Sequence, residues 1–195
     1  MIYKNQIIKI ENFKIDKELE KSIENLTNIL VKNMYDRQKD LTKIDNRKRK
    51  IQQGIISELI VYYYLKDNYQ EYFKYFEFSG LIQNLLNNSN GINLNVDEYD
   101  FKILNYSIDI KSSIENSKNY NINDNNEYIV KNKNYEKKFD SFESFLIKNR
   151  NFMVLPDQSN KDYTLQILFD KFNIPYICGF IDNKEIKIEE NFDIM

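Results

Sequence analysis

Residues 99–113, YDFKILNYSIDIKSS, constrain the fold of this chain more than any other stretch. They predict two short strands that alternate apolar and polar side chains and meet at a turn at Asn105 and Tyr106. The predicted cross-strand pairs are Leu104–Ser107, Ile103–Ile108, Lys102–Asp109, Phe101–Ile110 and Asp100–Lys111. Apolar side chains then share one face of the hairpin and charged side chains share the other. A one-residue slip would destroy this sorting.

The charged face of this hairpin brings together two acidic and two basic side chains, which are Asp100, Lys102, Asp109 and Lys111. Cross-strand neighbours lie about 4.5–5.5 Å apart at Cβ. Carboxylates at this distance can bind Mg²⁺, which keeps several waters and takes one or two carboxylates together with a substrate phosphate. Such an ion activates water, and a neighbouring lysine stabilises the negative charge that develops on the phosphate. The pattern therefore suits metal-dependent phosphodiester hydrolysis. A solvated face with ordinary Asp–Lys pairs is the alternative.

A second informative stretch is IQQGIISELIVYYYLKD, residues 51–67, which predicts a helix. Between Lys50 and Lys66 it contains one charge, Glu58. A helix that is apolar nearly all round is buried, and a buried glutamate needs a cation or several hydrogen bonds to offset its desolvation. The sequence therefore predicts a partner for Glu58. The alternative is a glutamate at the helix surface, tied to Arg47 or Arg49.

The order of the acidic residues resembles a known motif. Asp100, followed after eight residues by Asp-Ile-Lys at 109–111, resembles the PD-(D/E)XK motif of the restriction-endonuclease-like phosphodiesterase superfamily. Tyr99 stands where that motif usually has proline. Asp97 is the other candidate for the first acid, but parity places it on the apolar face. The segment GIISE, residues 54–58, resembles the Gly-x-x-Gly-Glu segment of the same superfamily, with Ser57 where glycine is commoner.

This resemblance covers roughly residues 54–181 and implies an α/β fold with a restriction-endonuclease-like core, a central mixed β-sheet flanked by helices. It implies a Mg²⁺-dependent endonuclease that cleaves double-stranded DNA and leaves a 5′ phosphate. The implied metal ligands are Asp100, Asp109, the Ile110 carbonyl and Glu58, which binds the ion or positions its water. Lys111 would orient the attacking water and stabilise the phosphate charge. Gln166, on a later strand, would be an accessory residue.

Small size and no separate specificity domain favour a type II restriction enzyme that acts as a homodimer on a short palindrome, because a twofold protein matches a twofold site. Other functions stay open. They are a repair, recombination or phage-defence nuclease of the same fold, a DNA-binding or interaction protein without catalysis, and a structural domain. A DNA-binding role is compatible with a formal net charge of -2 only through local basic patches.

Two sets of basic residues could contact DNA phosphates. The first lies in the run KIDNRKRK, residues 43–50, and consists of Arg47, Lys48, Arg49 and Lys50. A solvated helix junction is the alternative for this run. The second set lies in residues 115–138, a polar segment rich in Asn, Lys and Tyr that is expected to be a long loop, and consists of Lys118, Lys131 and Lys133.

Composition limits the chemistry and the domain organisation. The chain has 195 residues, enough for one domain, with an N-terminal helical segment at 1–50 and a core at 51–181. The absence of histidine excludes histidine-metal nucleases and Ser-His or Cys-His triads. The single cysteine, Cys178, is expected in the core. With no signal peptide and no apolar run of membrane-spanning length, a soluble cytoplasmic protein is expected.

The remaining elements are predicted from periodicity. A helix is expected from an N-cap at Asp16 to about Leu41, and a short helix over 140–147. Strands are expected at 91–96, 152–155, 163–169 and 175–181.

Overall fold

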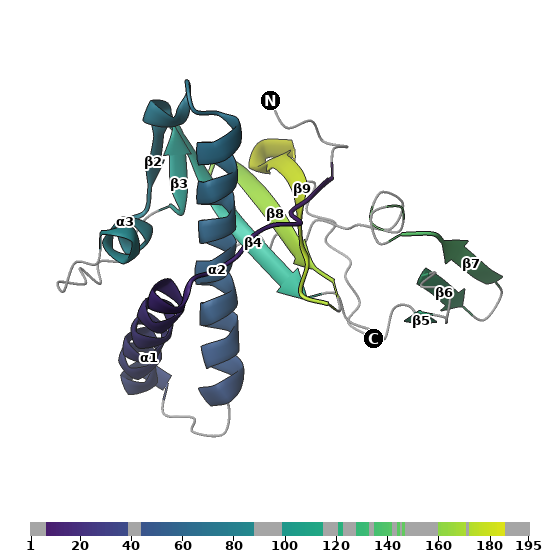
Figure 1. Ribbon diagram of the computed structural model, residues 1–195, viewed down its shortest axis with the longest axis horizontal. Coiled ribbons are helices and arrows are strands. Elements are labelled where there is room, and N and C mark those ends of the chain that lie inside the picture. Colours follow the sequence, from purple (N-terminus) through teal and green to yellow (C-terminus); the bar gives the residue numbers. More distant parts are fainter. Residues whose placement is uncertain are drawn as a thin grey trace. The chain divides into compact units, whose positions relative to one another are not determined.

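The computed structural model describes residues 7–38, 44–87, 99–114, 121–122, 128–132, 135–141, 144, 146, 160–170 and 172–185. The chain divides into two compact units, residues 12–110 and residues 1–11 together with 111–195. Figure 1 labels the helices and strands. The larger sheet is mixed, and its six described strands follow the order β1-β9-β8-β4-β3-β2. The described residues also form α-helices. The predicted α/β class is therefore confirmed. The boundary between the units lies within β4 (Tyr106–Ile114).

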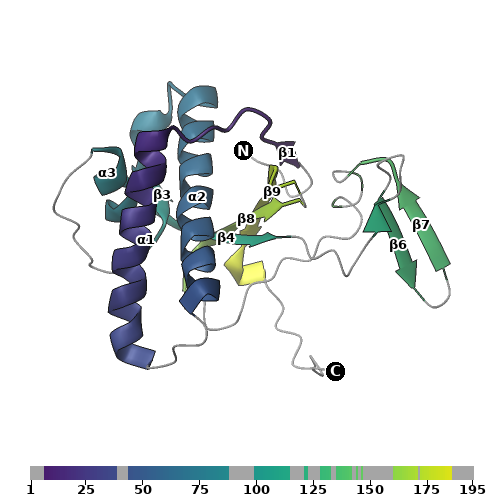
Figure 2. The ribbon, with the colours of Figure 1, turned by 60° about the horizontal axis from the view of Figure 1, so that its bottom comes forward.

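The described residues of the unit 12–110 include three α-helices. They are α1 (Lys17–Gln38), α2 (Ile44–Asn68) and α3 (Gly80–Leu86). α1 packs along α2 in the opposite direction, and both contact α3 (Figure 2). The predicted N-cap of α1 is confirmed, because the Asp16 carboxylate accepts a hydrogen bond from the Leu19 amide at 2.8 Å. Ile23 and Leu26 are buried, as their helical spacing predicts.

α2 begins earlier than its apolar sequence suggests. The predicted start was Ile51, whereas the helix begins at Ile44 and includes residues 44–50 of the basic run. That run is therefore no junction between helices, and a boundary at residue 50 would cut a continuous element. The buried residues of α2, which are Ile55, Ser57, Leu59, Ile60, Val61 and Leu65, are spread around the helix, and the other residues from Ile51 to Tyr64 are half-buried. No residue between Ile51 and Leu65 is exposed, in accord with the prediction of a buried helix, and Glu58 is half-buried.

The core of this unit joins α2 to a three-strand layer. β2 (Phe76–Phe78), β3 (Phe101–Ile103) and β4 are antiparallel neighbours, and a 3-10 helix, η2 (Phe73–Tyr75), precedes them. Phe78 stacks on Phe101 with ring centroids 5.5 Å apart, and Tyr62 of α2 meets Phe78 edge-on at 4.9 Å. These rings give the sheet face a large apolar area against α2. The segment containing β2 and α3 had no prediction from sequence.

The hairpin of β3 and β4 forms, but its predicted register is wrong. The observed pairs are Phe101–Ile108, Lys102–Ser107 and Ile103–Tyr106, a shift of two residues from those predicted. The turn lies at Leu104 and Asn105, where Leu104 takes a left-handed conformation with φ of 56°. Because the shift is even, side chains keep their faces: Phe101, Ile108 and Ile110 are buried and the charged residues are half-buried.

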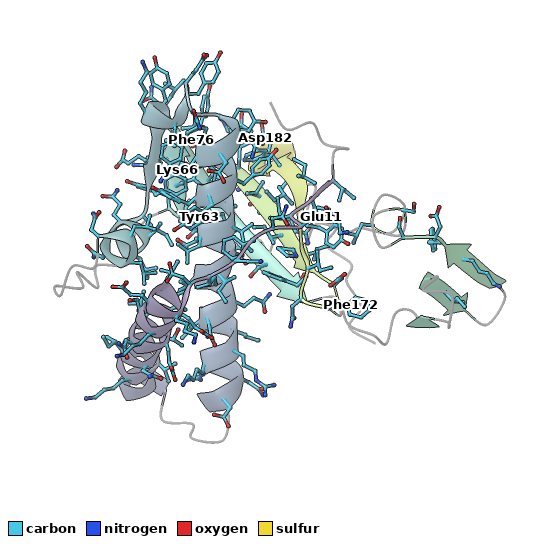
Figure 3. All side chains as sticks on the ribbon, in the orientation of Figure 1. Glu11, Tyr63, Lys66, Phe76, Phe172 and Asp182 are labelled. Carbon is cyan, nitrogen blue, oxygen red and sulfur yellow. The ribbon has the colours of Figure 1, made fainter. Side chains whose placement is uncertain are left out.

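The other unit is built from antiparallel strands. β8 (Tyr163–Phe169) pairs with β9 (Pro175–Asp182), which also pairs with β1 (Ile8–Lys9), and a 3-10 helix, η4 (Asn183–Glu185), follows. Both long strands lie where the sequence predicts them. The turn between them carries Phe172, which is exposed (Figure 3). The buried core of this unit consists of Ile7, Phe139, Leu146, Leu168, Tyr176 and Cys178, which confirms the expected core position of the cysteine.

Residues 115–138 contain strands, which corrects the prediction of a long loop. β5 (Asn121–Ile122), β6 (Tyr128–Asn132) and β7 (Tyr135–Phe139) form a separate three-stranded sheet. Among the described side chains of this sheet, Ile129 and Phe139 are buried. Ser144 and Leu146 are helical, with the Ser141 hydroxyl accepting the Ser144 amide at 3.1 Å, in accord with the predicted short helix. The strands predicted at 91–96 and 152–155, and Asp97, lie outside the described residues.

Candidate functional site

Asp100 lies at an irregularity where β3 begins. Its backbone N–H donates to the Ile108 carbonyl at 3.2 Å, although Ile108 already faces Phe101. Two consecutive residues thus oppose one, which is the arrangement of a β-bulge, a feature that re-aims side chains. The predicted pair of Asp100 with Lys111 is replaced by a different contact. The Asp100 Oδ2 atom accepts the Ile110 amide at 2.5 Å.

This hydrogen bond places the Asp100 carboxylate against the Asp-Ile-Lys segment of β4. Ile110 is buried, while Asp109 and Lys111 on either side of it are half-buried and share the opposite face of the strand. The first acid of the predicted motif therefore contacts the residue between the second acid and the lysine. Sequence reasoning predicted this convergence but through a different register.

Glu58 is tied to the same place by a serine. The Ser79 hydroxyl donates to Glu58 Oε2 at 3.1 Å, and the Ser79 backbone N–H donates to the Asp100 carbonyl at 2.9 Å. Ser79 connects β2 to α3 and is buried. One residue thus links the helix that carries Glu58 to Asp100, the residue that precedes β3. Ser79 thus gives Glu58 a hydrogen-bond partner of the kind that the sequence predicts.

Sequence reasoning missed Ser79, although a signal was present. The sequence reads Ser79-Gly80-Leu81-Ile82, with a further leucine pair at 85–86, and a serine before an apolar run at helical spacing is an N-cap signature. The Ser79 hydroxyl does accept the Ile82 amide, at 3.4 Å. That signature would have placed a helix there, but not its contact with Glu58, which is 21 residues away in sequence.

Lys102 does not join the acids as predicted. It lies opposite Ser107 and Glu77, and its Nζ atom is 3.9 Å from the centre of the Tyr99 ring. The Tyr99 hydroxyl donates to Glu77 Oε1 at 2.5 Å. Lys102 is therefore engaged by a cation–π contact beside the Asp100 bulge. This separates the two lysines of the hairpin, and Lys111 is the one that adjoins Asp109 in β4.

The donor set fits Mg²⁺ in type. Among the described residues, no three acidic or cysteine side chains gather in the manner of a protein-only metal site. Mg²⁺ needs no such group, because it is held by one or two carboxylates with waters and substrate phosphate. Asp100 and Asp109 supply these carboxylates, and Asp100 uses its Oδ2 atom for the Ile110 amide. The Ile110 carbonyl is a third oxygen of the same segment.

Gln166 belongs to the other unit, in β8. It is buried at an irregularity in the β8–β9 pairing, between Leu165 and Ile167. Within the described part of the chain, its Oε1 atom has no hydrogen-bond partner. A buried amide oxygen of this kind usually binds a protein or water donor. The accessory role suggested for it remains a prediction.

The described basic residues that are predicted to contact DNA lie on two elements, α2 and β6. Those at 47–50 lie in the first turns of α2, where Lys48 Nζ is 3.6 Å from Glu24 of α1. Lys131 is in β6, in register with Glu136. Lys118 and Lys133 lie outside the described residues. The role of all these basic residues in DNA binding remains a prediction.

None of the described helices has the length and apolar character needed to cross a membrane.

No family model matches this chain, and no curated protein or solved structure matches it either.

Proposed function

We propose that this protein is a Mg²⁺-dependent endonuclease that hydrolyses phosphodiester bonds in double-stranded DNA, and that it acts as a homodimeric restriction enzyme of type II. The observation that carries this proposal is the hydrogen bond from the Ile110 amide to Asp100 Oδ2. It joins the first acid to the strand segment that holds the second acid and a lysine. Those residue types in that order are the ones the PD-(D/E)XK resemblance requires.

The bond supports a catalytic use of Asp100 because it leaves the carboxylate fixed. Asp100 is held through three backbone or side-chain contacts, namely its N–H to Ile108, its carbonyl to Ser79 and its Oδ2 to Ile110. An acid held by that many contacts loses little side-chain freedom on binding a ligand. Preorganisation of this kind is what a reacting phosphate needs from its surroundings.

The ion would be held by Asp100, Asp109 and the Ile110 carbonyl. Glu58, whose partner Ser79 also binds the Asp100 backbone carbonyl, would bind the ion or position its water. A Mg²⁺ ion bound there supplies positive charge that neutralises the scissile phosphate. Lys111 follows Ile110 in β4 and donates hydrogen bonds to the attacking water and to a phosphate oxygen. Water adds to phosphorus in line with the leaving group and releases a proton to solvent, the bond from phosphorus to the 3′ oxygen breaks, and the leaving oxygen takes a proton from solvent. The products are a 3′ hydroxyl and a 5′ phosphate.

The test is cleavage of unmethylated plasmid and phage DNA by the pure protein in Mg²⁺ and in EDTA. We expect discrete fragments in Mg²⁺ that Lys111→Ala and Asp109→Ala both abolish. Lys102→Ala is the matched control, since it removes a lysine from the same hairpin that contacts Tyr99 instead. Cleavage by the Lys111→Ala protein at the wild-type rate would refute the assigned chemistry. An inert wild-type protein, with Mg²⁺ or Mn²⁺ on duplex, branched and single-stranded DNA, would refute the proposed function.

A further inference from the structure

Ser79 occupies a junction at which three elements meet. It is buried, follows the last residue of β2, precedes the first residue of α3 and reaches α2 through its side chain. Its backbone N–H extends the β2–β3 ladder by one bond, to the Asp100 carbonyl. Its hydroxyl proton is directed to Glu58 Oε2. One residue therefore connects the Glu58 carboxylate, through its hydroxyl, to the backbone of Asp100, through its N–H.

We propose that Ser79 is a positioning residue that holds the Glu58 carboxylate beside Asp100 and thereby sets the affinity of the site for its divalent ion. This inference rests on the proposed function, because it assigns Glu58 to the ion site. Ser79 itself touches neither ion nor DNA in this scheme. It acts through Glu58 on one side and the Asp100 backbone on the other.

A helix cap alone does not account for Ser79. The hydroxyl lies 3.4 Å from the Ile82 amide, compared with 2.8 Å for the Asp16 cap of α1. The cap is thus the longer of its two side-chain hydrogen bonds, since Glu58 is at 3.1 Å. Asparagine or aspartate would cap α3 as well as serine does. Aspartate, however, is acceptor-only when ionised and could not donate to Glu58.

Groups that orient metal ligands are costly to remove. Loss of such a partner commonly weakens metal binding or activity roughly 10-fold to 100-fold. Glu58 keeps its place on α2 without Ser79, so the lower end applies and we expect Ser79→Ala to raise the half-saturating Mg²⁺ concentration about tenfold. The rate at saturating Mg²⁺ should change little, because Asp109 and Lys111 are untouched.

The experiment compares Ser79→Ala, Ser79→Thr, Glu58→Gln and the Ser79→Ala/Glu58→Gln double variant in the full-length protein. Ser57→Ala is the matched control: it removes another buried serine hydroxyl, one residue from Glu58, that donates to the Gln53 carbonyl of its own helix. Two quantities are measured. The first is the Mg²⁺ dependence of DNA cleavage, and the second is Mn²⁺ binding without DNA, by electron paramagnetic resonance.

The inference predicts weaker Mn²⁺ binding and a higher Mg²⁺ requirement for Ser79→Ala, near wild-type behaviour for Ser79→Thr and Ser57→Ala, and no added effect of Ser79→Ala in the Glu58→Gln background. Equal Mn²⁺ binding by wild type and Ser79→Ala would overturn it, as would a full Ser79→Ala effect in the absence of Glu58. Ser79→Gly replaces the alanine variant if that protein does not fold, since glycine is a better N-cap.

The two hypotheses fail in different ways. A wild-type protein that cleaves DNA while Ser79→Ala behaves identically would refute the positioning role and leave the nuclease proposal intact. Mn²⁺ binding that depends on Ser79, in a protein that cuts no DNA, would support the link and refute the nuclease. A wild-type protein that neither binds Mn²⁺ nor cuts DNA would refute both.

Discussion

Asp100 has two roles to test: it accepts a hydrogen bond from the Ile110 amide, and it is the proposed charged ligand of the metal ion. Two different substitutions distinguish these roles. Asp100→Ala removes both the carboxylate charge and the acceptor for the Ile110 amide, whereas Asp100→Asn removes the charge and keeps an oxygen acceptor. We therefore expect both variants to lose cleavage, because each lacks the charged ligand. Only the alanine variant should also lose local stability.

The size of that loss follows from burial. Ile110 is 9% exposed, so its amide has little access to water when the carboxylate is gone. A buried donor left unsatisfied costs about 1–3 kcal/mol. A loss of about 2 kcal/mol corresponds to roughly 30-fold faster exchange of the Ile110 amide, since 1.4 kcal/mol is tenfold. Asparagine keeps a neutral hydrogen bond, and its exchange rate should stay within roughly fivefold of wild type, a difference near 1 kcal/mol.

The assay is native-state hydrogen exchange of the Ile110 amide by NMR, run beside DNA cleavage for wild type and both variants. The amide of Ile108 serves as the internal reference. Ile108 lies in the same strand as Ile110 and pairs with Phe101 of β3. Unchanged Ile110 exchange in Asp100→Ala would show that the carboxylate does not hold this amide and would refute the geometry. Cleavage by Asp100→Asn would instead refute the metal-ligand role.

Three further predictions concern the folded state. Phe101→Ala should lower the free energy of unfolding by about 3–5 kcal/mol, because the ring is 1% exposed and stacks on Phe78; urea unfolding measures this, and a loss under about 1 kcal/mol would contradict it. Burial and a hydrogen bond with Tyr69 raise the pKa of Tyr64 to about 12 from 10.0, so its contribution is complete below pH 10 and is lost as the pH rises to about 12. The melting temperature of the Tyr64→Phe protein should accordingly fall less steeply from pH 10 to pH 12 than that of wild type. Asp170→Ala should destabilise the β8–β9 turn by about 1–3 kcal/mol, since Asp170 Oδ1 accepts two amides at 2.8 Å, and Asp170→Asn should cost less in the same melts.

Local signals predicted much of the fold. The N-cap at Asp16 was readable because an acidic residue preceded a helical repeat of apolar residues. The sequence predicts β8 and β9 because each is a largely apolar run of strand length, and both are buried along most of their residues. The faces of the β3–β4 hairpin were readable because parity alone decides them.

Non-local and conformational features escaped prediction. The hairpin register depends on a left-handed leucine, and leucine seldom adopts positive φ, so no propensity indicates it. The small sheet of β5, β6 and β7 was hidden by its Asn, Lys and Tyr content, which favours a loop on composition alone. The sequence could not predict Ser79 as the partner of Glu58, because the two residues come together only when β2 and α2 pack against each other.

The turn at Leu104 has a consequence for how such a chain can change over evolution. A slip of two residues leaves the inward and outward sets of side chains intact, so strand composition barely distinguishes the observed register from its neighbour. The conformation of the turn therefore decides between the two registers, and a left-handed non-glycine residue in that turn costs about 1 kcal/mol. Substitutions at positions 104 and 105 could therefore move Asp100 along β4, away from the Ile110 amide, without exposing the core. Two proteins with the same strands and core could therefore differ in whether the first acid contacts the strand segment that carries the second. The residues responsible for that difference would lie in an exposed turn.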